Sequence, residues 1–321
     1  MCTRLLSAGG LHVVLLGLLP AAAAADPLAY ITNQLDDNVS VIDIEARALV
    51  GTHSVGHRPA GVYVCPDSKH VVVSNAEGQS ISVFTAKTKE QAQVTTIPLG
   101  QGPVGITCTQ SHIYVADWYE HLVRVVEIAS LHTVATIAVG QSPAGVLADP
   151  HRNRLYVANR DSDSVSIIDL ADTQASTEIA VGDAPFGLAL SHSGKQLFAV
   201  NVRSGDVSVI DTSTLRVTAN IEVGTWPYCA IVSPDDRRLF VTNQEDDTVS
   251  VIDLEIGREL TTIDVGETPE GIDISADGRW VIVVNWGSGN VTVIDAEVLT
   301  VADTISSGRG SRGFGRFITT H

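Results

Sequence analysis

The feature that most constrains the fold of this 321-residue sequence is an internal repeat with a fixed period of 42 residues. Residues 29–43 read AYITNQLDDNVSVID, and residues 239–253 read LFVTNQEDDTVSVID. A fixed period of this length is typical of an architecture built from one repeated supersecondary unit. Seven copies align on one polar residue after a short apolar run: Asn33, Asn75, Asp117, Asn159, Asn201, Asn243 and Asn285.

Each repeat reads as four short β-strands. Runs such as LYVAN and SVSIIDL are rich in Val, Ile and aromatic residues, and Gly, Pro, Asn and Asp bound them. No helical periodicity competes with this pattern. Seven sheets of four antiparallel strands, set radially, form a seven-bladed β-propeller. We therefore predict an all-β fold in which residues 26–321 make one propeller domain of seven repeats.

The two ends of the chain are expected to share one blade. The sequence after the predicted leader starts midway through a repeat, and it ends with SRGFGRFITT, the first strand of a further copy. We expect Gly313 to Thr320 to pair beside Tyr30 to Asn33. Pairing of the C-terminal strand with the N-terminal blade would close the ring and remove its open sheet edges.

The repeated residues have backbone roles that explain their recurrence. The Asn that ends VTN and the Asp that ends VID suit hairpin ends, where their side chains bond their own backbone two residues on and tolerate left-handed dihedrals. A second phrase follows each copy, from VGHRPAG to VGETPEG, and its Gly and Pro mark the crossing between sheets. We interpret both phrases as scaffold without chemistry of their own.

The N-terminal segment predicts export. Residues 1–25 carry Arg4, an apolar run from Leu11 to Leu19 and the sequence PAAAAAD, which together are typical of a signal peptide cleaved after Ala25. The apolar run is shorter than the roughly 20 residues that a membrane span needs. We expect a periplasmic or secreted protein with no membrane span after cleavage.

Charge and sulfur content narrow the ligands. Asp and Glu number 37 against 20 Lys and Arg, which argues against nucleic acid as a partner. The acidic residues lie in many turns, where they form a soluble shell or attract a basic partner. No CxxCH motif is present, and the only Met is Met1, so we expect no covalently bound cofactor and no axial Met ligand. Cys65 and Cys108 are predicted to point to opposite faces of their strands, which does not favour a disulfide.

Function is sought where the repeats differ, and the third copy differs most. Its loop after the second strand reads WYEH, with Trp118, Tyr119 and His121, where other copies read QEDD or RDSD. This loop class and the VGxxPxG loops emerge on the same face of the ring, so aromatic residues gather there. Exposed aromatic side chains are favoured anchors at interfaces, although these rings could instead cap the apolar ends of the blades. The aromatic set is Trp118, Tyr119, Phe186, Trp226, Tyr228 and Trp286.

The residue after each conserved Pro lines the predicted axial mouth. Three of these positions are small and apolar, and four are bulky or charged, which indicates an asymmetric mouth. Glu270 and Arg312 occupy equivalent positions in adjacent blades and are expected to pair, either as a structural ion pair or as a site for a small polar ligand beside Trp226 and Tyr228. The seven positions are Ala60, Val104, Ala144, Phe186, Tyr228, Glu270 and Arg312.

Catalytic and metal signals are weaker. His57, His121 and Glu270 could form a zinc or iron set on the same face, but no close-spaced ligand motif supports it. A divalent metal therefore stays an open alternative, and no metal site is assigned. No GxSxG or HExxH motif marks a nucleophile or a metalloprotease. Cys229 replaces the usual Gly of PxG, and a packing substitution explains it as well as reactivity does.

The phrases LYVAN, LFVTN and VSVID make residues 28–320 resemble the YVTN-type β-propeller repeat family of bacterial periplasmic proteins. The resemblance implies the fold and says little about function, because related propellers include periplasmic companions of quinone- or copper-dependent dehydrogenases and also sugar-acid lactonases. One hypothesis is a non-catalytic scaffold that docks a periplasmic redox enzyme, or a metal- or cofactor-handling system, through its aromatic face. The alternative is a lactonase-like hydrolase with a site at the axial mouth. We favour docking, since Glu270 is the only carboxylate at the mouth positions.

Overall fold

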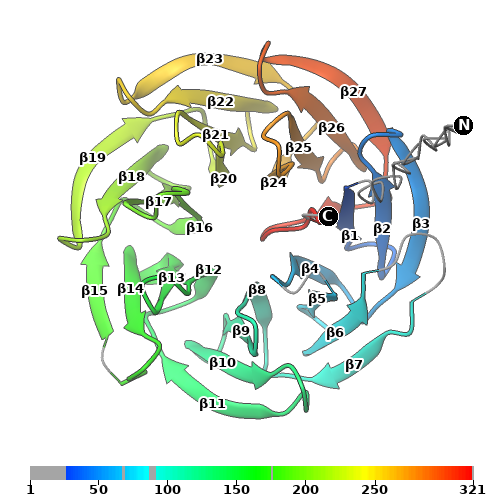
Figure 1. The fold of residues 1–321 in the computed structure, drawn as a ribbon, viewed down its shortest axis with the longest axis vertical. Coiled ribbons are helices and arrows are strands. Elements are labelled where there is room, and N and C mark those ends of the chain that lie inside the picture. The colour runs from blue at the N-terminus through cyan, green and yellow to red at the C-terminus, as the bar shows by residue number, and fades with distance from the viewer. Residues whose placement is uncertain (1–26, 67–68, 87–91, 175, 320–321) are drawn as a thin grey trace, which may run out of the picture.

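The computed structural model describes residues 27–319 except 67–68, 87–91 and 175, and it forms a ring of seven four-stranded antiparallel sheets (Figure 1). The predicted signal peptide, residues 1–25, lies outside the described residues. The all-β, seven-bladed prediction is confirmed. A single turn of 3-10 helix, η1 (Arg160–Ser162), is the only helical element of the described ranges, and nothing helical within them is long and apolar enough to span a membrane.

The first three blades in chain order are β28 (Ser311–Arg312), β1 (Leu28–Asn33), β2 (Asn38–Asp43), β3 (Ala48–Ser54); β4 (Pro59–Val64), β5 (His70–Asn75), β6 (Ser80–Thr85), β7 (Thr95–Pro98); and β8 (Pro103–Cys108), β9 (His112–Asp117), β10 (Leu122–Glu127), β11 (Thr133–Ala138). The other four are β12 (Pro143–Asp149), β13 (Arg154–Asn159), β14 (Ser164–Asp169), β15 (Ser176–Ala180); β16 (Pro185–Leu190), β17 (Gln196–Asn201), β18 (Asp206–Asp211), β19 (Arg216–Glu222); β20 (Pro227–Val232), β21 (Arg238–Asn243), β22 (Thr248–Asp253), β23 (Arg258–Asp264); and β24 (Pro269–Ile274), β25 (Trp280–Asn285), β26 (Asn290–Asp295), β27 (Thr300–Ser306).

The core lies between neighbouring blades. The second and third strands of each blade are almost fully buried, because apolar side chains on both of their faces pack against the adjacent sheets. The outermost strand is mostly exposed, and in β23 the only buried residue is Ile263. This gradient explains why the two middle strands carry near-continuous Val and Ile, as strands buried on both faces do.

The repeated Asn pins the hairpin between the second and third strands. Asn243 donates from Nδ2 to Thr248 Oγ1 at 3.0 Å and to Ser250 Oγ at 2.9 Å, five and seven residues along the chain. Five other blades repeat these two bonds. The expectation that this Asn bonds its own backbone and sits in a left-handed turn is therefore wrong. The left-handed residue is four positions further on, for example Asp247 at φ 55°.

The Asp that ends VID behaves as predicted. Asp253 accepts hydrogen bonds from the backbone N–H groups of Glu255 and Ile256, two and three residues on, and Asp211 and Asp295 make the same turns. These turns lie at the end of the ring opposite to the VTN hairpins, because consecutive antiparallel strands reverse direction.

The two repeated phrases contact each other. A Cβ built on Gly224, in the loop that leads into its blade, would lie 2.6 Å from Asn243 Cγ, and Gly140, Gly182 and Gly266 meet their own Asn in the same way. Such an approach leaves no room for a side chain. The Gly of VG and the Asn of VTN therefore recur together because one packs directly on the other.

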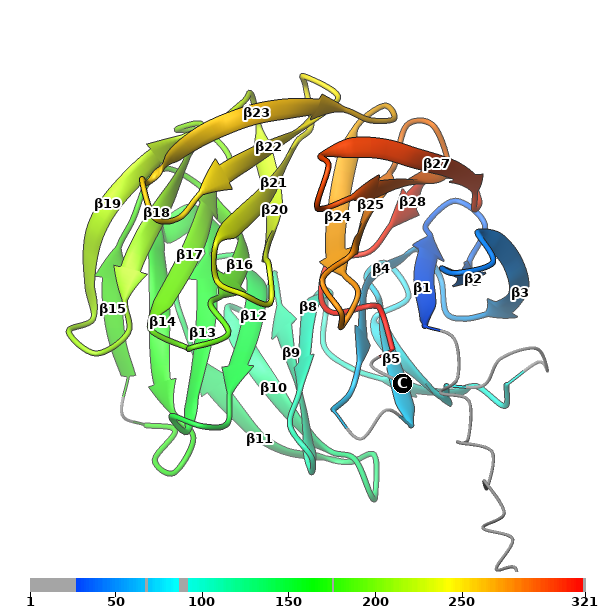
Figure 2. The ribbon, with the colours of Figure 1, turned by 45° about the horizontal axis from the view of Figure 1, so that its top comes forward.

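The C-terminal segment closes the ring along its inner side (Figure 2). Thr32 and Asn33 of β1 pair with Arg312 and Ser311, which confirms the predicted shared blade. The pairing is not continuous over Gly313 to Thr320 as expected, because the chain bulges at residues 313–316 and bonds β4 instead, with Val62 N donating to the Phe314 carbonyl at 3.2 Å. It returns to β1 at the Ala29–Ile318 bridge, and Thr320 lies outside the described residues.

A disulfide between Cys65 and Cys108 joins the second and third blades, with Cα atoms 5.2 Å apart. Our expectation did not favour this bond, and it was wrong. Side chains of opposite parity cannot meet within one sheet, but these two residues belong to neighbouring sheets that pack face to face. Opposite faces of adjacent blades are the faces that meet, so the alternation favours the bond.

Candidate functional site

The axial mouth is occupied by side chains from the second residue of the inner strands. Glu270 and Arg312 form the predicted pair, with Arg312 Nε 2.5 Å from Glu270 Oε2 and Nη2 3.1 Å from Oε1. Arg312 Nη2 also donates to Tyr228 Oη at 3.1 Å, and Gln244 Nε2 donates to Glu270 Oε1 at 3.2 Å. Only 7% of the Glu270 side chain and 18% of that of Arg312 are exposed. The pair is therefore a satisfied, largely buried network.

An aromatic row crosses the mouth from the third blade to the sixth. The rings of Phe186 and Tyr228 stack with centroids 4.0 Å apart, and Trp118 lies 6.5 Å from Phe186. Phe314, from the C-terminal bulge, meets Phe186 edge-on at 5.5 Å. These rings pack with Ala60, Val104 and Ala144 in one apolar cluster, which fills the mouth.

The electrostatics of this network disfavour a nucleophile. Burial, reinforced by the Glu270 charge, raises the pKa of Tyr228 and of the Cys229 thiol well above their ordinary values. Burial alone would lower the pKa of Arg312, but the adjacent Glu270 outweighs this effect and raises it. Tyr228 and Cys229 therefore stay protonated near neutral pH, and Arg312 stays charged.

The predicted exposure of the aromatic set is only partly correct. Tyr119 is 70% exposed and Trp226 is 50% exposed, whereas Phe186 is buried and Trp118, Tyr228 and Trp286 are half-buried. Phe186 and Tyr228 turn toward the axis and pack on each other, and Trp286 Nε1 donates to Gln34 Oε1 at 3.2 Å. The exposed rings thus lie at the two ends of the row, next to Trp118 and Tyr228 in the chain. We call this side of the ring, defined by Trp118, Tyr119, Trp226 and Tyr228, the aromatic end.

The histidines of this end have structural contacts. His121 Nδ1 accepts from Ser142 N at 3.0 Å, the same loop contact that Asp163 makes with Ala184 N in the next blade. His57 pairs with Asp37, with Nδ1 3.0 Å from Oδ2. Within the described ranges, no three His, Cys, Asp or Glu side chains are placed to hold a metal, so His57, His121 and Glu270 are not brought together as a ligand set.

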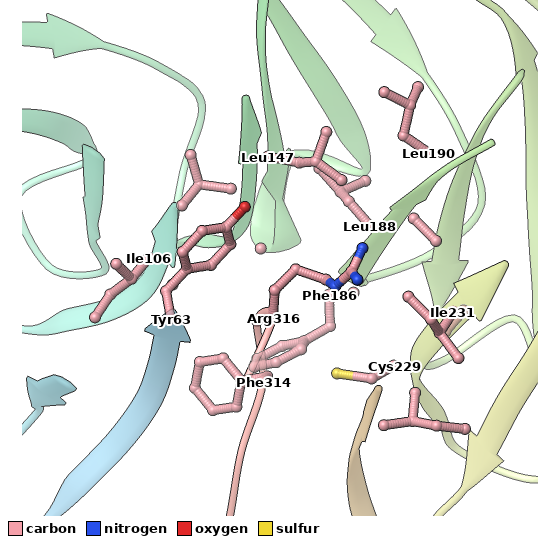
Figure 3. A pocket seen from close by; sticks show the side chains of 18 of the residues that line it. Tyr63, Ile106, Leu147, Phe186, Leu188, Leu190, Cys229, Ile231, Phe314 and Arg316 are labelled. Atoms are coloured by element: carbon pink, nitrogen blue, oxygen red, sulfur yellow. The ribbon is translucent and has the colours of Figure 1, made fainter. Parts of the chain in front are cut away.

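The structure adds an axial cavity that sequence reasoning missed. It has a volume of about 250 Å³ and begins beneath Phe186 and Phe314 (Figure 3). It extends along the inner strands to Leu190, Ser191 and the exposed His192, at the end opposite to the aromatic end. The departure of SRGFGRF from the repeat was the available signal, because the bulge in that segment places Phe314 and Arg316 at the axis.

Comparisons with known proteins agree on the propeller. Residues 227–313 match the family model described as cytochrome D1 heme domain, and residues 106–224 match the model described as lactonase, 7-bladed beta-propeller. Each match covers less than half of the chain. No curated protein sequence matches significantly.

Solved structures resemble the chain in fold. A functionally unknown protein from Desulfotomaculum acetoxidans DSM 771 has a TM-score of 0.78 at 12% identity, covering 88% of this chain and 98% of its own. Hydrazine synthase from Kuenenia stuttgartiensis has a TM-score of 0.71 at 20% identity, covering 79% and 88%. The dihydro-heme d1 dehydrogenase NirN, in complex with DHE, has a TM-score of 0.67 at 16% identity, covering 86% and 63%. At these identities the likeness shows the fold alone.

Proposed function

We propose that this protein is an exported, non-catalytic β-propeller that docks a partner protein on its aromatic end, with Tyr119 and Trp226 as anchors. The observation that carries the proposal is their exposure at the two ends of an otherwise buried aromatic row. Large aromatic side chains contribute most of the energy of many protein interfaces, and leaving them in water is unfavourable. Trp226 is also held at φ 53°, a conformation that is an outlier for a bulky residue.

A cleft beside Tyr119 strengthens this surface. It has a volume of about 330 Å³ and lies between the second and third blades, lined by Glu77, Gln101, Val104, Trp118 and Tyr119 among others. An apolar wall with a polar rim is the usual anatomy of an interface. The cleft could receive one side chain of the partner.

The partner we propose is a protein with a basic face. The chain carries a formal net charge of −17, and carboxylates such as Glu77, Glu245 and Asp246 lie in the loops of the aromatic end. Charge of this sign steers a basic partner and repels acidic ones. A redox enzyme of the periplasm fits the proposal, since hydrazine synthase and a dihydro-heme d1 dehydrogenase are among the similar folds.

The test is capture of the partner from a periplasmic extract of the native host, analysed by native mass spectrometry. We expect a stoichiometric complex with the wild type and at least a tenfold weaker complex with Trp226→Ala or Tyr119→Ala, because anchor residues commonly contribute more than about 1.4 kcal/mol. The matched control is Ile256→Ala, since Ile256 is 53% exposed at the opposite end. Full capture by both aromatic variants would contradict the proposal.

A lactonase-like hydrolase is the second candidate, supported by the family match over residues 106–224. Under this function Glu270→Gln should abolish turnover of small lactones. The geometry favours docking, because Glu270 is already committed to Arg312 and Gln244. Lactone turnover that Glu270→Gln abolishes, in a variant that still folds, would reverse this preference.

A further inference from the structure

We propose that the axial cavity binds a small apolar monocarboxylate, whose carboxylate is held by Arg316 and Tyr63. This site is separate from the docking surface. The cavity lies beneath the aromatic row and opens at the opposite end of the ring, so a ligand there and a partner on the aromatic end would not compete for space.

The cavity contains a guanidinium in an otherwise apolar lining. Arg316 projects into it from the C-terminal bulge, among Ile106, Leu147, Leu188 and Ile231 (Figure 3). The bulge is fixed on both sides, since Arg316 O accepts from Val64 N at 2.7 Å and Gly315 adopts φ 119°. The direction of this side chain is therefore built into the closure of the ring.

Asp273 fixes one edge of the guanidinium and leaves the other available. Its Oδ1 lies 2.8 Å from Arg316 Nε, and its Oδ2 accepts from the backbone N–H groups of Phe317 and Ile318. Asp273 is fully buried, whereas 40% of the Arg316 side chain remains accessible from the cavity side. Within the described part of the chain, neither Nη group of Arg316 has a hydrogen-bond partner. Two donors therefore face the cavity in the fork geometry that matches a carboxylate.

Tyr63 supplies a further donor. It lines the cavity from β4, and Figure 3 shows its hydroxyl directed into the same space as the Arg316 head group. No hydrogen-bond partner for this hydroxyl occurs among the described residues. A carboxylate bound to Arg316 could thus accept from Tyr63 with its remaining lone pairs.

The size and charge of the cavity define the ligand class. An apolar cavity of about 150 Å³ is known to hold benzene, so about 250 Å³ suits one ring, or a branched chain of similar size, together with a carboxylate. Asp273 offsets part of the Arg316 charge, and the only other titratable side chain of the lining besides Tyr63 and Cys229 is His192 at the open end. A single negative charge is therefore favoured over a dianion.

The test is isothermal titration calorimetry of the full-length mature protein with benzoate, phenylacetate and isovalerate, and with benzamide as the neutral counterpart of benzoate. We expect at least one carboxylate to bind with a dissociation constant of about 1 mM or tighter, and benzamide to bind at least about tenfold more weakly. Equal binding of benzoate and benzamide, or no binding of any carboxylate up to about 10 mM, would overturn the proposal.

Variants place the binding in the cavity. Leu188→Trp fills the space and keeps the Arg316–Asp273 pair, and it should abolish binding. Tyr63→Phe removes one donor and should weaken binding about threefold to tenfold. Tyr119→Ala, at the aromatic end, is the control and should leave the affinity unchanged. Binding that survives Leu188→Trp in a folded variant, shown by an unchanged far-ultraviolet circular dichroism spectrum, would exclude the cavity as the site.

Discussion

At the scale of single residues, burial changes the role of Glu270 and Arg312. The sequence places them in adjacent blades and predicts their pairing, and an exposed pair of this kind would contribute about 0 to 1 kcal/mol. The structure buries both and completes their hydrogen bonding with Tyr228 and Gln244. In this environment removal of one partner leaves an uncompensated charge, which is far more costly than loss of a surface pair.

We predict that Glu270→Gln lowers the free energy of unfolding by about 3 kcal/mol, because Arg312 is left buried without a counter-charge. The double variant Glu270→Gln/Arg312→Gln should lose less than Glu270→Gln alone. Urea unfolding followed by circular dichroism measures both values, and Glu255→Gln, in an exposed turn, is the control. A double variant that is less stable than either single variant would show that the pair is not the source of the loss.

At the scale of the structural element, one hairpin departs from the pattern of the other six. Asp117 stands where the other blades have Asn, and Arg124 stands where they have Ser or Thr. Asp117 accepts from Gln101 N at 2.9 Å, from Gly102 N at 3.1 Å and from Arg124 Nε at 3.3 Å. Burial alone would raise the pKa of Asp117, but these hydrogen bonds outweigh it and hold the pKa below its ordinary value of 3.8. The ion pair thus replaces the Asn amide as the pin of this hairpin.

The replacement predicts a pH dependence specific to the third blade. Because the pKa of Asp117 is lower in the folded than in the unfolded state, its contribution to stability is present above pH 3.8 and is lost as the pH falls below that value. The variant Asp117→Asn/Arg124→Ser restores the residues of the other blades and should remove this component. The difference in urea midpoint between pH 5 and pH 3 measures it.

The single variant Arg124→Ser is the control for this prediction. It keeps the Asp117 carboxylate and its backbone donors, so part of the pH dependence should remain. Identical pH profiles for the wild type and the double variant would show that Asp117 does not titrate as described.

At the scale of the whole molecule, two devices join the blades around the ends of the chain. The C-terminal segment bonds both β1 and β4, and the Cys65–Cys108 disulfide bonds the second blade to the third. Neighbouring blades elsewhere in the described ring are joined by packing and hydrogen bonds alone. The part of the ring that contains both ends of the propeller is therefore the most cross-linked.

We predict that Cys65→Ala/Cys108→Ala lowers the free energy of unfolding by about 2 to 4 kcal/mol, since the crosslink restricts the unfolded chain between blades. Thermal unfolding with and without a reductant measures the effect. The wild type should lose stability on reduction, and the variant should not respond. Cys229 is free and buried, so its substitution by Ala should not change the response to reductant. Equal stability of the oxidised and reduced wild type would contradict the prediction.

The sequence by itself determined the number of blades, their strands, the shared blade at the closure and the pairing of Glu270 with Arg312. These features follow from a period of 42 residues, because a fixed period places equivalent residues at equivalent points of successive blades. Only the tertiary structure decided which aromatic rings are exposed, that Cys65 meets Cys108, and that Arg316 enters an axial cavity. Those outcomes depend on how faces of different blades meet and on a backbone bulge at residues 313–316, and the repeat pattern contains neither.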